Sequence, residues 1–133
     1  SLHDVARRAI RDFKRKTDVD VDFDFSDSIP DTSIAKKQII YRAMTEIMNN
    51  AYKHAGATEL KGYLQVRNKD LCLEISDSGI GFDPKKLYQN QDRLGLIGLQ
   101  QRIMLVAGRL DIQSEPDNGT VINVTLPIGD KIA

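Results

Sequence analysis

The longest periodic segment of the chain, residues 34–55, most constrains the fold. Its apolar positions form a broad stripe, made of Ile39, Ile40, Ala43, Met44, Ile47, Met48, Ala51 and Tyr52. This stripe is wider than a lone surface helix needs. Ser33 or Thr32 can cap the start of the helix, and Gly56 is expected to follow its last turn. The segment therefore predicts a long helix with a large buried face.

Shorter segments on both sides complete the expected fold. Helical spacing of apolar residues predicts helices over residues 2–16 and 96–107, the second of them ended by Gly108. Alternation and short apolar runs predict five strands, at residues 19–25, 59–66, 71–76, 110–114 and 120–126. This order predicts an α+β fold, a two-layer sandwich whose mixed, mostly antiparallel sheet is covered on one face by three helices.

Side-chain directions follow from the same patterns. In the first strand, Val21 and Phe23 alternate with aspartates, which predicts a half-buried strand with an acidic outer face. Cys72 lies on the face opposite Leu71, where a reduced packing cysteine is expected. The inward positions expected of the last helix are Leu96, Leu99, Ile103, Val106 and Ala107.

Composition bounds the class of protein. The 133 residues, 41% of them hydrophobic and 29% charged, fit one globular domain over residues 1–133. Equal numbers of acidic and basic side chains, 19 each, argue against a nucleic-acid binder that relies on counterion release. One cysteine cannot form an internal disulfide, and no apolar run is long enough to span a bilayer. A cytoplasmic domain is expected.

The long helix also carries a group of polar residues. Glu46, Asn50, Lys53 and His54 are three or four positions apart, which predicts one polar stripe opposite Met44, Met48 and Ala51. A carboxylate, an amide oxygen and an ammonium group on one face suit a polyphosphate that carries Mg²⁺. A solvated helix face with a Glu–Lys pair is the alternative interpretation.

Three glycine-containing segments could face a ligand. Residues 77–82 read DSGIGF after a strand, so Asp77 could accept a hydrogen bond from an exocyclic amine, but an ordinary turn has the same pattern. Gly95 and Gly98 open a helix whose free N–H groups could meet phosphate, or could only allow tight packing. Gly119 precedes Thr120, whose hydroxyl could support the aspartate.

Together these segments resemble a known family. The strings EIMNNAYKHA (46–55), DSGIGF (77–82) and GLIGLQQR (95–102) are similar to the N box and the two glycine boxes of sensor histidine kinases. The ending GTVINVTLP (119–127) resembles their closing strand. The resemblance covers residues 1–128 and implies the ATP-binding fold that gyrases and heat-shock chaperones share, in the subfamily related to nitrate and lipid-fluidity sensors.

The resemblance implies roles for these positions. Asn50 would bind Mg²⁺, Glu46 would polarise the phosphate acceptor or a water, and Lys53 and His54 would approach the phosphates of ATP. Asp77 would bind the adenine amino group with support from Thr120. The pocket would be shaped by Gly79, Gly81 and Phe82, and the phosphate-facing helix start would be formed by Gly95, Leu96, Gly98 and Leu99. Residues 85–93 would form a short lid, with Arg93 at a position where the family usually has glycine.

The resemblance also implies a reaction and partners. The γ-phosphoryl group of ATP would pass to a histidine on an upstream dimerisation domain absent from this chain, for relay to a response regulator. The fragment would be a monomer and its parent a homodimer. Glu46 follows His3 by only 43 positions, too few for the acceptor hairpin, so His3 is expected to be a surface residue near the end of a linking helix. Residues 1–16 would be the end of that hairpin or a helix of the domain itself.

Other functions remain open at this point. An anti-sigma-factor-type serine kinase of the same fold would phosphorylate a protein hydroxyl, and an ATP-binding regulatory module would bind nucleotide without phosphotransfer. A globular domain that binds no nucleotide is the third alternative. The chain contains no P-loop, no Gly-x-Ser-x-Gly string and no His-Arg-Asp string, which removes support for other common enzyme classes.

Overall fold

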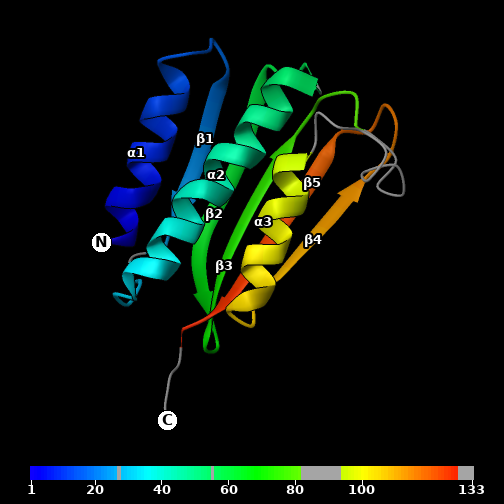
Figure 1. The fold of residues 1–133 in the computed structure, drawn as a ribbon. Coiled ribbons are helices and arrows are strands. Elements are labelled where there is room, and N and C mark those ends of the chain that lie inside the picture. Colours follow the sequence, from blue (N-terminus) through cyan, green and yellow to red (C-terminus); the bar gives the residue numbers. More distant parts are fainter. Residues whose placement is uncertain (27, 55, 82–93, 129–133) are drawn as a thin grey trace.

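A computed structural model describes residues 1–26, 28–54, 56–81 and 94–128. Its eight elements are α1 (Leu2–Lys14), β1 (Asp20–Phe25), α2 (Ile34–His54), β2 (Glu59–Arg67), β3 (Asp70–Asp77), α3 (Leu94–Leu105), β4 (Arg109–Ser114) and β5 (Thr120–Pro127). Their order and type agree with the sequence-based expectation (Figure 1). The ends of the elements differ from the predicted ones by at most two residues.

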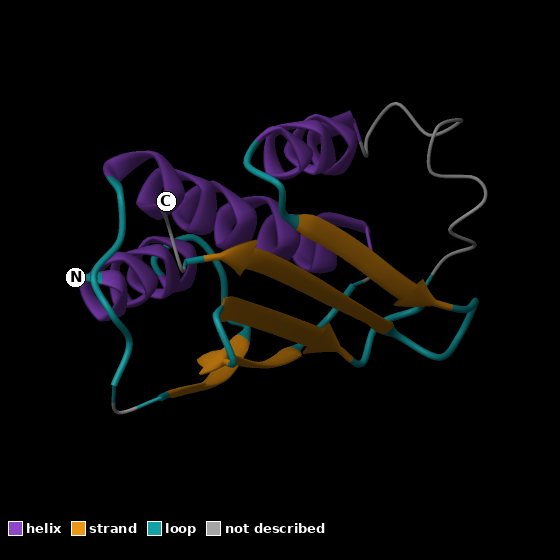
Figure 2. Cartoon of the chain, turned by 90° about the horizontal axis from the view of Figure 1, so that it is seen from below, coloured by secondary structure: helices purple, strands orange, loops and turns teal. Residues whose placement is uncertain are grey.

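The five strands form one sheet in the order β1-β2-β3-β5-β4. The β1–β2 pair is parallel and the three other pairs are antiparallel. All three helices lie on one face of this sheet (Figure 2). The predicted α+β sandwich with a mixed, mostly antiparallel sheet is therefore confirmed.

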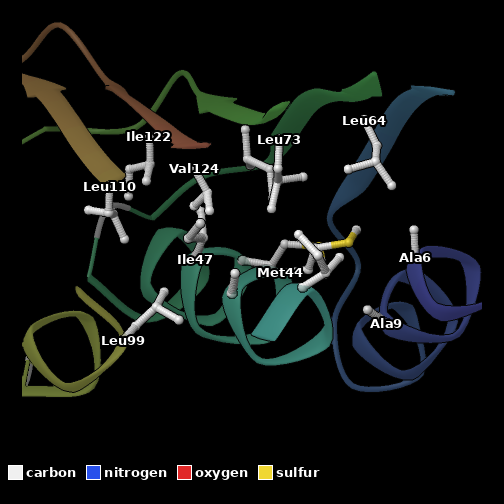
Figure 3. Close-up of a cluster of buried hydrophobic side chains, with 14 of the residues drawn as sticks. Ala6, Ala9, Met44, Ile47, Leu64, Leu73, Leu99, Leu110, Ile122 and Val124 are labelled. Atoms are coloured by element: carbon white, nitrogen blue, oxygen red, sulfur yellow. The ribbon is translucent and has the colours of Figure 1, made fainter. Parts of the chain in front are cut away.

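The core fills the space between the helices and the sheet. Every second residue of the central strands points toward the helices, because successive side chains of a strand alternate between the two faces. Leu73 and Val124 come from the sheet and Met44 and Ile47 from α2, and these side chains meet in one cluster (Figure 3). The long helix α2 thus buries its broad apolar stripe against the middle of the sheet.

The ends of α2 follow the predicted chemistry. Ser33, and not Thr32, caps the helix, since its Oγ accepts a hydrogen bond from the backbone N–H of Lys36 at 3.2 Å. At the other end Gly56 has φ +61°. The N–H of Ala57 then donates to the carbonyl oxygen of Ala51 at 3.1 Å, which satisfies a carbonyl of the last turn.

The end of α3 differs from the prediction. The residue with left-handed backbone is Ala107 (φ +60°), and the N–H of Gly108 donates to the carbonyl oxygen of Ile103 at 2.9 Å. Gly108 is required for packing instead, because a Cβ there would lie 2.7 Å from the carbonyl oxygen of Thr125. Ala107 was expected to point inward, and it is exposed because the left-handed turn directs it outward.

A second correction concerns Tyr52, which was expected in the buried stripe of α2. Its side chain is 45% exposed, and its ring contacts Phe13 edge-on at 6.4 Å. One step along a helix rotates the side-chain direction by about 100°, so the residue after buried Ala51 points toward the rim of the helical layer.

Two predictions about the strands are confirmed. The aspartates of β1, which are Asp20, Asp22 and Asp24, are exposed, while Val21 and Phe23 are half-buried. Cys72 is a free, half-buried cysteine on β3, and burial raises the pKa of its thiol.

Candidate nucleotide-binding site

Asn50 combines burial with an unused acceptor atom. Its side chain is 8% exposed, and its Nδ2 donates to the carbonyl oxygen of Glu46 at 2.7 Å. That bond orients the amide, and the buried Oδ1 has no hydrogen-bond partner among the described residues. A buried acceptor without a partner is unfavourable by about 1–3 kcal/mol, so Oδ1 of Asn50 is a candidate ligand atom.

The position of Asn50 corrects one sequence-based expectation. The polar stripe was expected opposite Met44, Met48 and Ala51. Asn50 instead lies at the edge of the buried face next to Ala51, which is 4% exposed. Asn50 is therefore not part of a solvated helix face.

Glu46 lies against the first turn of α3. A Cβ added at Gly95 would come within 2.2 Å of Oε2 of Glu46, so only glycine allows this close approach. The structure thus brings together two residues that are 49 positions apart in the sequence. It also places a carboxylate beside a helix start, where the helix dipole favours negative charge.

Lys53 and His54 lie in the last turn of α2. Lys53 is exposed and His54 is half-buried. Both follow Asn50 by three or four positions and therefore lie on the same side of the helix.

Asp77 is the last residue of β3, and its carboxylate is held by the following loop. The N–H of Gly79 donates to Oδ1 of Asp77 at 2.8 Å. The register pairs Asp77 with Thr120 on β5, which puts the two side chains on the same face of the sheet. The residues expected to bind and support adenine are therefore neighbours.

Ser114 is a site residue that the sequence analysis missed. Its Oγ donates to the carbonyl oxygen of Gly119 at 3.0 Å and lies 2.7 Å from Oγ1 of Thr120, which is 5% exposed. A serine at the end of β4 carries no signal of its own in the sequence. Only the β4–β5 register, which pairs Ser114 with Thr120, could have indicated it.

The glycines of the DSGIGF segment and of the last turn let two loops approach each other. Gly81 has φ +65°, and a Cβ there would lie 2.1 Å from the carbonyl oxygen of Glu115. Gly119 has φ +75°, and its Cβ would lie 2.3 Å from the carbonyl oxygen of Asp77. Both positions therefore require glycine, and the two loops form one wall beside Asp77.

The start of α3 is only partly open to a ligand. The side chains of Leu96 and Leu99 are each 1% exposed and belong to the core, so only their backbone could face a phosphate. Gly98 is different, because a Cβ there would meet nothing within 4 Å. Phe82, the expected lid over 85–93 and Arg93 lie outside the described residues.

His3 lies in the first turn of α1 and contacts the end of β1. Its Nε2 lies 2.8 Å from the carbonyl oxygen of Ser26, and its ring is 5.3 Å from the ring of Phe25. The side chain is half-buried, which makes it less exposed than the expected surface residue.

Comparison with known proteins agrees with this geometry. A family profile described as "Histidine kinase-, DNA gyrase B-, and HSP90-like ATPase" matches residues 35–130, which include all of α2 except its first residue, both glycine segments and β5. The chain belongs to this family. It is an ATP-binding catalytic domain of the histidine kinase type.

Two curated relatives are histidine kinases by name. The chain is 34% identical over 96 residues to the oxygen sensor histidine kinase NreB of Staphylococcus carnosus (strain TM300), a match that covers 69% of this chain and 26% of the relative. It is 29% identical over 89 residues to the signal transduction histidine-protein kinase/phosphatase DegS of Brevibacillus brevis, covering 67% of this chain and 22% of the relative. The chain thus spans about a quarter of the length of these proteins.

Solved structures show the same fold. The histidine kinase AdeS of Acinetobacter baumannii matches with a TM-score of 0.78 and 18% identity, over 96% of this chain and 65% of that one. The histidine kinase domain of the blue-light activated kinase EL346 of Erythrobacter litoralis matches with a TM-score of 0.71 and 18% identity, over 93% and 59% of the two chains. Within the described part of this chain, no helix is both long and apolar enough to cross a membrane.

Proposed function

We propose that this domain binds ATP together with Mg²⁺ and transfers the γ-phosphoryl group to a histidine on an upstream part of its parent protein. The observation that carries the proposal is the buried Oδ1 of Asn50, which has no partner among the described residues. Family membership supports the ATP half of the proposal. Transfer of phosphate to a histidine is supported by the names of the two curated relatives.

The donor set fits Mg²⁺. An amide oxygen is a hard ligand of the kind this ion prefers, and Mg²⁺ is commonly held by one or two protein groups together with phosphates and water. Among the described residues no cluster of three His, Cys, Asp or Glu side chains could hold a metal alone. Asn50 would hold the ion, which would neutralise charge on the phosphates when bound.

The remaining site residues bind the adenine base or orient the reacting groups. Asp77, fixed by the N–H of Gly79, accepts a hydrogen bond from the adenine amino group, while Thr120 and Ser114 support it from the sheet. Glu46 orients the attacking imidazole and takes up its proton. Catalysis then depends on position and on charge stabilisation, as in phosphoryl transfer generally.

Phosphotransfer in the full-length parent protein tests this proposal. With ATP labelled in the γ-phosphate, the label should appear on the protein as an acid-labile, alkali-stable phosphohistidine. Glu46→Gln should leave ATP affinity within about twofold and slow transfer by about 100-fold or more, because general-base assistance is typically of that size. Glu59→Gln, an exposed carboxylate on β2, should change neither quantity.

Two results would contradict the proposal. An acid-stable phosphate on a serine would instead favour the serine-kinase alternative. A Glu46→Gln variant that transfers phosphate as fast as the wild type would remove Glu46 from the mechanism.

A further inference from the structure

The helix α3 has more apolar surface than the fold covers. Its twelve residues include a single charged side chain, Arg102. Leu96 and Ile103 are buried against the sheet, but Met104 is 65% exposed and Leu105 is 85% exposed. Large apolar side chains that are exposed next to each other are typical of a surface to which another element or protein binds.

A groove runs beside this uncovered surface. It has a volume of about 870 Å³ and lies between the first half of α2 and the second half of α3, with α1 at its far side. In Figure 1 these two helices lie farther apart toward the start of α2 and the end of α3. Its apolar lining includes Ile34, Ile39, Leu99, Leu105 and Val106, and Ile34 is 74% exposed.

The charges around the groove are mostly positive. Its charged lining residues are Arg8, Lys37, Arg42 and Arg102, with Glu46 as the one carboxylate. Lys37 pairs with Asp31 at 2.7 Å, and the guanidinium of Arg8 lies 4.6 Å from the centre of the Tyr41 ring. For Arg42 and Arg102 no ion pair is formed within the part of the chain that the structure describes.

The same sign of charge extends over the whole helical layer. The three helices carry nine Lys or Arg residues and three Asp or Glu residues, whereas the five strands carry three basic and eight acidic residues. The net charge of zero therefore hides a cationic helical face and an acidic sheet. Such a separation attracts an acidic partner to the helices and orients it on approach.

We propose that this groove is a docking site for an acidic amphipathic helix of a partner protein. The apolar face of that helix packs on Ile34, Ile39 and Leu105, and its carboxylates pair with Arg42 and Arg102. From Ile34 to Glu46 the groove follows α2 for about 18 Å, which matches about three turns of a helix at 1.5 Å per residue. Binding of an amphipathic helix between two helices is a recurrent recognition mode.

The docking site is separate from the nucleotide site. Glu46 lines the end of the groove, while Asn50 and Asp77 lie beyond it and do not line it. The docked helix thus lies beside the catalytic carboxylate without filling the adenine pocket. The proposal does not depend on the proposed phosphotransfer, because it rests on the apolar and charged lining of the groove.

A peptide titration followed by nuclear magnetic resonance tests the proposal. The probe is a synthetic 18-residue amphipathic peptide with leucines at helical spacing and glutamates at the other positions. It should shift the amide signals of residues 34–46 and 99–106, and the same peptide with lysines in place of glutamates should bind at least tenfold more weakly. Unchanged signals in these two segments at saturating peptide would overturn the proposal.

Variants separate groove binding from general charge attraction. The affinity for the acidic peptide should fall at least tenfold in the double variant Arg42→Glu, Arg102→Glu, and at least tenfold in the single variant Leu105→Ser. Because Leu105 is 85% exposed, its replacement should not prevent folding. Lys61→Glu with Arg109→Glu on the sheet should have no effect. An equal loss in the sheet variant, or unchanged binding of Leu105→Ser, would overturn the proposal.

Binding to anionic lipid vesicles tests whether the negatively charged partner is instead a membrane surface. Phosphatidylglycerol vesicles should not retain the domain through Leu105 and Arg102. Retention that both Leu105→Ser and Arg102→Glu abolish, together with no binding of the acidic peptide, would assign the surface to a membrane and overturn the proposal.

Discussion

Asn50 carries a side-chain oxygen that is buried and has no partner among the described residues, although its amide nitrogen is satisfied by the carbonyl oxygen of Glu46. Natural proteins satisfy nearly all buried polar atoms, since an unsatisfied one lowers stability. Under the proposed function, a cation bound at this oxygen would recover the free energy that is lost there. The oxygen would then serve binding and not stability.

This reasoning predicts opposite changes in stability and binding for Asn50→Leu. The substitution removes the unsatisfied oxygen and adds apolar contact in similar volume, so the nucleotide-free domain should be as stable as the wild type or more stable by about 1 kcal/mol. The increase in ATP affinity that Mg²⁺ provides should be lost. Thermal unfolding and nucleotide titration with and without Mg²⁺ measure the two effects.

The neighbouring asparagine provides the control for this prediction. Asn49 is half-buried on the same helix and forms no part of the site, so Asn49→Leu should preserve the effect of Mg²⁺. Equal sensitivity of ATP binding to Mg²⁺ in the wild type and in Asn50→Leu would show that Asn50 does not hold the ion.

At the residue scale the sequence indicates the candidate ligand-binding residues. It does not indicate the residues that hold them in place. Asn50 is recognisable because it lies between Glu46 and Lys53 on one helix. Asp77 is recognisable because it comes just before two glycines. Ser114 does not stand out, since its role follows from a strand pairing that a single chain of letters does not specify. The burial of Asn50 was also missed, because it depends on how closely α2 packs against its neighbours.

At the element scale two of the glycines in the α3 region, Gly98 and Gly108, have different functions. Gly98 lies inside the helix with open space where a Cβ would be, whereas a Cβ at Gly108 would lie 2.7 Å from a carbonyl oxygen and from Leu126. Of these two positions, only Gly108 is required by packing. The glycine at position 98 is consistent with close approach of a ligand to the helix start.

Alanine substitutions should separate these two functions. Gly98→Ala should stabilise the nucleotide-free domain by about 1 kcal/mol, because alanine favours helix formation. It should also weaken ATP binding. Gly108→Ala should destabilise the domain by about 1–3 kcal/mol through overpacking. Denaturant unfolding measures both changes, and equal stability of the two variants would contradict this account of α3.

The elements themselves were largely predictable, because each has a clear apolar period and a turn or cap at its end. The exceptions lie at helix ends, where tertiary contacts decide. Gly108 was expected to provide the left-handed residue after α3, yet Ala107 takes that conformation so that Gly108 can pack against the last strand. Sequence patterns contain no information on that packing.

At the scale of the whole molecule, the sheet order brings distant segments to one site. Asp77 and Thr120 become neighbours because β5 inserts between β3 and β4, and Glu46 meets Gly95 because α2 crosses next to α3. The sequence predicted the α+β class and the resemblance predicted the site, but the separation of charge between helices and sheet was hidden by a net charge of zero. That separation is visible only when each side chain is assigned to a layer.

The central claim is that these segments form an adenine-selective site for ATP with Mg²⁺. Isothermal titration calorimetry of the domain with ADP and with a non-hydrolysable ATP analogue, each with and without Mg²⁺ and with GTP as control, tests it most directly. The account predicts binding of the adenine nucleotides that Mg²⁺ strengthens, weak or no binding of GTP, and loss of this selectivity in Asp77→Asn. Equal binding of GTP and ATP by the wild type, or no binding at millimolar nucleotide, would contradict it.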